Sequence, residues 1–311
     1  STTNFCQTRV ISWLRLIKRK AKYEAQKKRI KKKEVMEINK IYNENCLETM
    51  AKMPDKFVDL VVTSPPYDGL RTYNGYSFPF EEIAKELYRI TKQGGVVVWV
   101  VNDSTKNGSE SLTSFRQAIY FKEIGFNVHD TMIYKAEKPP LTHNRYEQKF
   151  EYMFVFSKGK PKTFNPILEP SKYAGQDKKS RTMRQDSDEL GNRSGKGKVA
   201  DFKIKGNVWE YAIGGGKSTK DQVAFKHPAI FPEQLANDHI ISWSNENDLV
   251  YDCFMGSGTV AKMSILNNRN WIGSEISNEY CDIIEERVKK AWEEKRKEKE
   301  FNLITSFGDG M

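Results

Sequence analysis

Short apolar runs alternate with amphipathic segments along most of this chain, and no other feature constrains its fold as strongly. Val58–Val62 and Val96–Val101 are mainly apolar runs of strand length. Residues 80–91 between them have apolar positions at helical spacing, and Gly94-Gly95 is expected to stop that helix. Strands that alternate with helices predict a largely parallel, twisted sheet covered by helices. We therefore expect an α/β fold.

The same patterns predict further elements along the chain. Apolar residues at helical spacing indicate helices over 115–124, 232–242 and 278–299. Strands are expected over 128–134, 152–156, 249–253 and 271–276, and regular structure of unspecified type over 208–213.

Composition excludes several classes of protein. A hydrophobic content of 38% over 311 residues is enough for a core, so the chain is not disordered as a whole. Its longest apolar run, Val96–Val101, is far below the roughly 20 residues that a membrane span needs. We expect no secretory leader and no metal site, since the histidines lack metal-ligand spacing and the cysteines form no CxxC pair. A reducing, cytoplasmic compartment is therefore expected.

The first 40 residues carry the whole excess of positive charge. They hold 13 Lys and Arg against 3 acidic residues, which accounts for the net charge of +10. Val10, Leu14 and Ile17 have helical spacing, so a basic amphipathic arm over residues 1–37 is expected. It could dock on the body, contact the DNA backbone, or act as a targeting or membrane-surface segment.

Residues 165–222 interrupt the alternation of strands and helices. Between 171 and 198 few residues are apolar, and basic residues alternate with Gly and Ser. Such a stretch cannot build a core, so it is either a disordered insertion or a loop-rich surface that orders on a polyanion. The basic residues expected to contact that polyanion are Lys178, Lys179, Arg181, Arg184, Arg193, Lys196 and Lys198.

A glycine-rich turn, residues 252–259 (Asp-Cys-Phe-Met-Gly-Ser-Gly-Thr), ends one predicted strand and opens a helix. Its glycines let a ligand approach the backbone, and the helix N-terminus offers N–H groups to an anion. The next strand leads to Glu275, where an acid can accept hydrogen bonds from ribose hydroxyls. Neither a full GxGxxG nor a GxxxxGK[ST] motif is present, which weakens the hypothesis that the turn binds a dinucleotide or ATP. An ordinary tight turn with a surface glutamate is the alternative.

A second motif, Ser64-Pro65-Pro66-Tyr67, follows the strand predicted over 58–62. The two prolines stiffen the turn and lack N–H groups, so nearby carbonyls are left as acceptors. A planar ligand with an NH₂ group could donate to the Ser64 hydroxyl and the Pro65 carbonyl while Tyr67 stacks on its ring. A structural turn with a packed tyrosine is the competing interpretation.

In combination, these motifs resemble those of bacterial DNA amino-methyltransferases of the restriction-modification type. The resemblance covers residues 38–288 and follows the subgroup in which the catalytic motif precedes target recognition and the cofactor motif. It implies a Rossmann-like methyltransferase fold with S-adenosylmethionine (AdoMet) as cofactor and duplex DNA as substrate. The expected division is an arm (1–37), a catalytic part (38–164), a target-recognition region (165–222) and a cofactor-binding part (223–311). A cognate restriction endonuclease is a candidate partner.

The resemblance also implies roles for single residues. The target base would be held by Ser64, Pro65, Pro66 and Tyr67. The cofactor would be bound by Asp252, Phe254, Gly256, Ser257, Gly258, Thr259, Glu275, Ile276, Lys226, His227, Pro228 and Phe231. Two positions depart from the family pattern: Cys253 replaces a proline, and Asn45 stands where many relatives have an acid.

A serine at the start of the catalytic motif is usually associated in this family with N4 of cytosine, so that base is expected, with N6 of adenine as the alternative. The base would be flipped out of the duplex for direct methyl transfer without a protein nucleophile. Methylation of RNA or of a small-molecule amine, and a non-catalytic DNA-binding relic, are lower-ranked alternatives.

Overall fold

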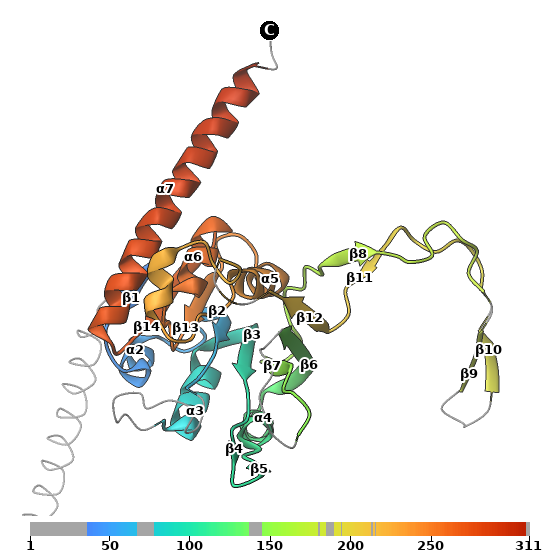
Figure 1. Cartoon of the computed structure of the whole chain (residues 1–311), viewed down its shortest axis with the longest axis horizontal. Helices are drawn as coiled ribbons and strands as arrows, with labels where there is room; N and C mark the ends of the chain where they lie inside the picture. Colours follow the sequence, from blue (N-terminus) through green and yellow to red (C-terminus); the bar gives the residue numbers. More distant parts are fainter. Residues whose placement is uncertain are drawn as a thin grey trace, which may run out of the picture.

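The computed structural model describes residues 36–66, 78–136, 145–179, 181–184, 190–193, 195–212, 214 and 216–308. Figure 1 shows a twisted sheet with helices on both faces, from which a long arm and the C-terminal helix project in different directions. The predicted N-terminal arm lies almost wholly outside the described residues. Within the described residues, no helix combines the length and apolarity that a membrane crossing requires.

Eight strands form the central sheet, in the order β1-β14-β13-β2-β3-β7-β6-β12. Only β7 runs antiparallel to its neighbours, β3 and β6, so the prediction of a largely parallel sheet is confirmed. The strands are β1 (Lys40–Tyr42), β2 (Val58–Thr63), β3 (Thr91–Val101), β6 (Asn127–Ala136), β7 (Phe150–Ser157), β12 (Val208–Tyr211), β13 (Leu249–Asp252) and β14 (Asn270–Ser274).

Two groups of helices cover the two faces of this sheet. One face packs against α2 (Cys46–Lys52), α3 (Phe80–Ile90) and α4 (Thr113–Glu123), the other against α5 (Glu233–Trp243), α6 (Thr259–Leu266) and α7 (Asn278–Gly308). The short 3₁₀ helix η1 (Gln222–Lys226) precedes α5. Alternate residues of β3 enter the two cores, as the two-residue period of a strand requires. The helices predicted over 115–124, 232–242 and 278–299 are confirmed.

The prediction that Gly94-Gly95 ends a helix is wrong. α3 ends at Ile90, Thr91 is already extended, and its hydroxyl donates to the carbonyl of Leu87. The two glycines lie inside β3 at a register shift against β2. A Cβ on Gly95 would lie 2.9 Å from the carbonyl oxygen of Asp59, so the glycine allows close approach of two strand backbones.

The described residues between 168 and 204 form a projection, called the arm below, that extends away from the sheet in Figure 1. β8 (Leu168–Pro170) pairs antiparallel with β11 (Phe202–Ile204) at its base, and β9 (Arg181–Arg184) pairs with β10 (Leu190–Arg193) near its tip. A second small hairpin, β4 (Thr105–Lys106) and β5 (Ser109–Glu110), follows β3. The described part of 165–222 is therefore mainly a narrow antiparallel ribbon, followed by β12 of the central sheet.

Candidate active site

The two motifs singled out in the sequence meet at the carboxyl ends of two central strands of the sheet. β2 and β13 are neighbouring parallel strands, with Tyr251 paired to Val61. Their carboxyl ends therefore lie side by side. One continues into Ser64-Pro65-Pro66 and the other into the glycine turn, which we define as residues 252–259. Tyr67 lies outside the described residues.

A buried hydrogen bond joins the two strand ends. The Thr63 hydroxyl donates to Asp252 Oδ1 at 2.6 Å, and the same oxygen accepts from the backbone N–H of Phe254 at 3.0 Å. Both side chains are almost inaccessible to solvent. Burial raises the pKa of Asp252 to about 7, while the hydrogen bond from Thr63 opposes that rise. The site thus contains a carboxyl group that is readily protonated near neutral pH.

Two glycines give the turn its shape. Gly256 and Gly258 have φ values of +53° and +80°, in the region that side chains disfavour. Gly258 is the N-cap residue of α6, and a Cβ there would lie 3.2 Å from the Cα atom of Ile284 on α7. The sequence prediction that these glycines form a tight turn opening a helix is confirmed.

Glu275 closes the turn from the neighbouring strand end. Its two carboxylate oxygens accept from the backbone N–H groups of Gly256 and Ser277, each at 2.9 Å. Burial raises the pKa of Glu275, and these two N–H groups partly counteract the rise. A carboxylate has about four acceptor positions, so both oxygens retain capacity for hydroxyl donors.

The segment 226–231 packs against the glycine turn. A Cβ on Gly256 would lie 3.1 Å from His227 Nε2, so the imidazole covers this residue directly. The His227 ring also meets Tyr280 edge to face, with 4.4 Å between centroids. The carbonyl of Phe231 accepts from the Thr259 hydroxyl at 3.2 Å. The structure thus brings His227 and Phe231 to the turn.

The remaining predicted cofactor residues occupy different surroundings. Lys226, Pro228 and Ile276 are exposed. The Phe254 ring packs edge to face against Phe78 and Trp99, on the side of the sheet covered by α3 and α4.

The side chains of Ser257 and Thr259 are buried beneath the turn, where both contact Arg287 of α7. Arg287 was not predicted from the sequence as their partner. Its Nη1 atom donates to the Ser257 carbonyl at 2.6 Å and to the Thr259 hydroxyl at 3.1 Å. A signal was present in the sequence, because Arg287 lies between Ile284 and Ala291 on the apolar side of the helix. A charge at such a position needs a buried partner.

Asn45, the departure from the family pattern near β1, has a structural role. Its side-chain oxygen accepts from the backbone N–H of Leu47 at 2.9 Å and caps the N-terminus of α2.

The predicted DNA-contacting residues are distant from the turn, on the projecting arm (Figure 1). Lys178, Lys179, Lys196 and Lys198 are exposed there. Arg181 and Arg184 lie in β9, and Arg193 lies in β10 opposite Arg181. The structure therefore gathers most of the cofactor candidates at the turn and leaves the basic candidates on a separate element.

Comparison with known proteins agrees with this arrangement. Residues 58–286 match the family model of the N6 and N4 methyltransferases described as DNA methylase. The chain belongs to this family. It is 58% identical over 238 residues to the orphan methyltransferase M.BamHII of Bacillus amyloliquefaciens, covering 76% of this chain and 90% of that protein.

Solved structures share the fold of this DNA methylase. PvuII DNA methyltransferase (cytosine-N4-specific) superposes with a TM-score of 0.59 at 21% identity, over 79% of this chain and 85% of that one. The complex of M1.HpyAVI with SAM gives 0.54 at 22% identity, over 80% and 98%. The Rossmann-like α/β fold is thereby confirmed. AdoMet as cofactor follows from membership of the DNA methylase family.

The residues at the turn of this methylase suit AdoMet. The methionine end of AdoMet carries a sulfonium and an ammonium group, and burial raises the pKa of Asp252. A cationic ligand beside Asp252 would favour its ionised form and compensate its burial. The Glu275 carboxylate retains acceptor positions that suit ribose hydroxyls.

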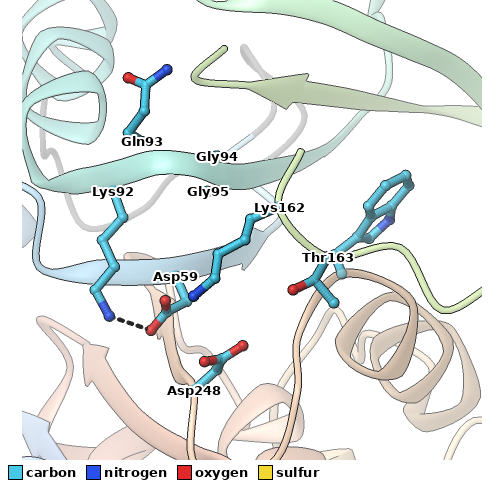
Figure 2. A pocket seen from close by; sticks show the side chains of 9 residues that line it. Asp59, Lys92, Gln93, Gly94, Gly95, Lys162, Thr163 and Asp248 are labelled. Carbon is cyan, nitrogen blue, oxygen red and sulfur yellow. Dashed lines mark hydrogen bonds and ion pairs between the residues drawn. The ribbon is translucent and has the colours of Figure 1, made fainter. Parts of the chain in front are cut away.

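A small pocket lies at the opposite ends of these strands, near the amino ends of β2 and β13. Figure 2 shows Lys92 reaching Asp59, with Lys162 and Asp248 beside them. The Lys92–Asp59 distance is 2.6 Å, and Asp59 also accepts from the backbone N–H of Leu249 at 3.0 Å. These contacts tie strand ends together. Across the described ranges, no three His, Cys, Asp or Glu side chains group as metal ligands would.

Proposed function

We propose that this DNA methylase transfers the methyl group of AdoMet to N4 of cytosine in duplex DNA, after the base has been flipped out. The observation that carries the proposal is the hydrogen bond between Thr63 and Asp252, because it holds the Ser64-Pro65-Pro66 motif beside the glycine turn. A methyl donor at the turn would then be close to an amine held by the motif.

Each part of the site would have a separate task. AdoMet supplies an electrophilic methyl group. Glu275 would accept hydrogen bonds from its ribose, and the glycine turn would hold its methionine end. Ser64 and the Pro65 carbonyl would accept hydrogen bonds from the amine and orient its nitrogen, while Tyr67 would stack on the base. No protein nucleophile is required for this transfer.

Cytosine is favoured over adenine by Ser64 at the head of the motif. N6 of adenine is the alternative, because both bases present an exocyclic amine to the same acceptors and the family includes both activities.

The arm supports duplex DNA as the substrate, with 165–222 as the target-recognition region between a catalytic part (38–164) and a cofactor-binding part (223–311). A two-stranded ribbon fits the major groove, and exposed lysines gain affinity by releasing counterions from phosphates. Exposed lysines on the described part of the arm include Lys178, Lys179, Lys196 and Lys198. RNA or a small amine would not need this extension.

The relative M.BamHII is named an orphan methyltransferase. That name supports a version of the proposal in which this chain also acts without a cognate endonuclease.

The test is to incubate the protein with AdoMet and mixed-sequence duplex DNA, digest the DNA to nucleosides, and identify the product by mass. N4-methylcytosine is expected, and Ser64→Ala should lower its yield by about 10- to 100-fold if the hydroxyl orients the amine. N6-methyladenine would contradict the base assignment and leave the fold and cofactor intact. Absence of both products would overturn the proposed substrate.

A further inference from the structure

Four charged side chains lie together under the glycine turn, with the two cations buried and the two acids partly buried. Arg287 contacts Asp221 through Nε at 3.0 Å and Glu233 through Nη2 at 2.6 Å. Lys262 contacts the same two carboxylates, each at 2.9 Å. The Arg287 side chain has no solvent exposure and that of Lys262 has 9%. Two cations and two anions balance, so the cluster brings no net charge into the interior.

The two cations differ in what else they contact. Arg287 also donates from Nη1 to the carbonyl and the hydroxyl of Ser257, at 2.6 and 3.2 Å, and to the Thr259 hydroxyl at 3.1 Å. In the described part of the chain, the hydrogen bonds of Lys262 Nζ go to the two acids and to no atom of the turn. Arg287 therefore joins the ion-pair cluster to the backbone of the turn, whereas Lys262 only completes the cluster.

The two acids connect Arg287 to the segment that covers the turn. Asp221 immediately precedes η1, and Glu233 is the first residue of α5. Between them lie His227, which packs on Gly256, and Phe231, whose carbonyl accepts from Thr259. Arg287 thus holds the glycine turn with one edge of its guanidinium and the ends of the covering segment with the other.

We propose that Arg287 is a positioning residue for AdoMet binding, which fixes the glycine turn and the segment 221–233 relative to each other. A role in stability alone would not need this arrangement, since a well-packed apolar cluster stabilises a core at least as well as buried ion pairs. The planar fork of arginine is needed to bond the acids and the turn at once, and lysine cannot reproduce it. The inference rests on the proposed location of AdoMet at the turn.

The experiment compares AdoMet binding by four proteins: the wild type, Arg287→Lys, Lys262→Met and Glu275→Ala. Calorimetry gives Kd at a temperature where circular dichroism shows each variant folded, and steady-state kinetics gives kcat and KM. Arg287→Lys keeps the charge but loses the fork, so Kd and KM for AdoMet should rise about tenfold or more, with a smaller change in kcat at saturating AdoMet. Lys262→Met breaks the same cluster without touching the turn and should change Kd less than about threefold.

Equal effects of Arg287→Lys and Lys262→Met on Kd, or no effect of Arg287→Lys, would show that the cluster serves stability alone and would overturn the proposal. If Arg287→Lys does not fold, Thr259→Val removes one of the two hydroxyls of the turn that Arg287 contacts, together with the hydrogen bond from Thr259 to the Phe231 carbonyl of the covering segment. Thr259→Ser retains both contacts. Weaker binding by the valine variant but not the serine variant is then expected, and equal binding would overturn the proposal. An unchanged Kd for Glu275→Ala would instead contradict the location of AdoMet at the turn.

Discussion

Asp252 illustrates, at the scale of a single residue, how two separate motifs form one site. The sequence predicts one strand that ends close to Asp252 and another that ends just before Thr63. It does not predict that these strands are neighbours, because the residues are 189 positions apart. The hydrogen bond between them, and the burial that raises the pKa of Asp252, follow from strand order rather than from local pattern.

The raised pKa of Asp252 predicts how stability depends on pH. Its pKa is about 7 in the folded protein against an ordinary 3.8, so the folded state binds the proton more tightly than the unfolded chain. The resulting stability is fully present below about pH 4 and is lost as the pH rises through 7. Asp252→Asn does not titrate there. Its free energy of unfolding relative to wild type should therefore increase by about 2 to 3 kcal/mol between pH 5 and pH 8.

Urea unfolding of both proteins across this pH range measures the difference, in which all other titrating groups cancel. A difference that stays constant would show that Asp252 is already ionised in the folded protein at pH 5.

Among helices and strands, the spacing of apolar residues predicts which segments adopt which structure. It does not predict where glycines fall within them. The predicted bounds agree with the observed ones to within one or two residues for β2, β13 and α4. Gly94-Gly95 was misplaced because its role, close approach to β2, depends on a partner strand rather than on the helix before it. β1 and α2 were missed because each is short, with three and seven residues, and carries little periodic signal.

The arm is an element that can be removed cleanly. Pro170 and Phe202 are directly opposite each other in the β8–β11 pair, so an Asn-Gly turn can replace residues 171–201. The shortened protein should keep its AdoMet affinity and lose most of its DNA affinity. Titration calorimetry and DNA binding at several salt concentrations check this expectation.

A charge variant in which Lys178, Lys179, Lys196 and Lys198 are changed to glutamine is the matched control for this deletion. It should retain the ribbon and reduce the slope of log affinity against log salt by up to about 3 to 4. Undiminished DNA binding by the shortened protein would show that the DNA surface lies elsewhere.

At the scale of the whole molecule, the site depends on the central position of β2 and β13 in the sheet. Helices from both halves of the chain buttress these strands from opposite faces. AdoMet at a concentration of 100 times its Kd should therefore stabilise the whole fold, by about 2.7 kcal/mol. Thermal unfolding with and without AdoMet measures the gain. Glu275→Ala should show a smaller gain at the same AdoMet concentration, and an equal gain would place the cofactor away from the turn.

The separation of Thr63 and Asp252 along the chain has a consequence for synthesis on the ribosome. At about 5 to 20 residues per second, β13 emerges roughly 10 to 40 s after β2. During that interval the edge of β2 that will pair with β13 has no partner, and an open apolar strand edge readily pairs with other chains. The nascent protein therefore carries the Ser64-Pro65-Pro66 motif on an unprotected strand, which chaperones or the ribosome itself would have to shield during that time.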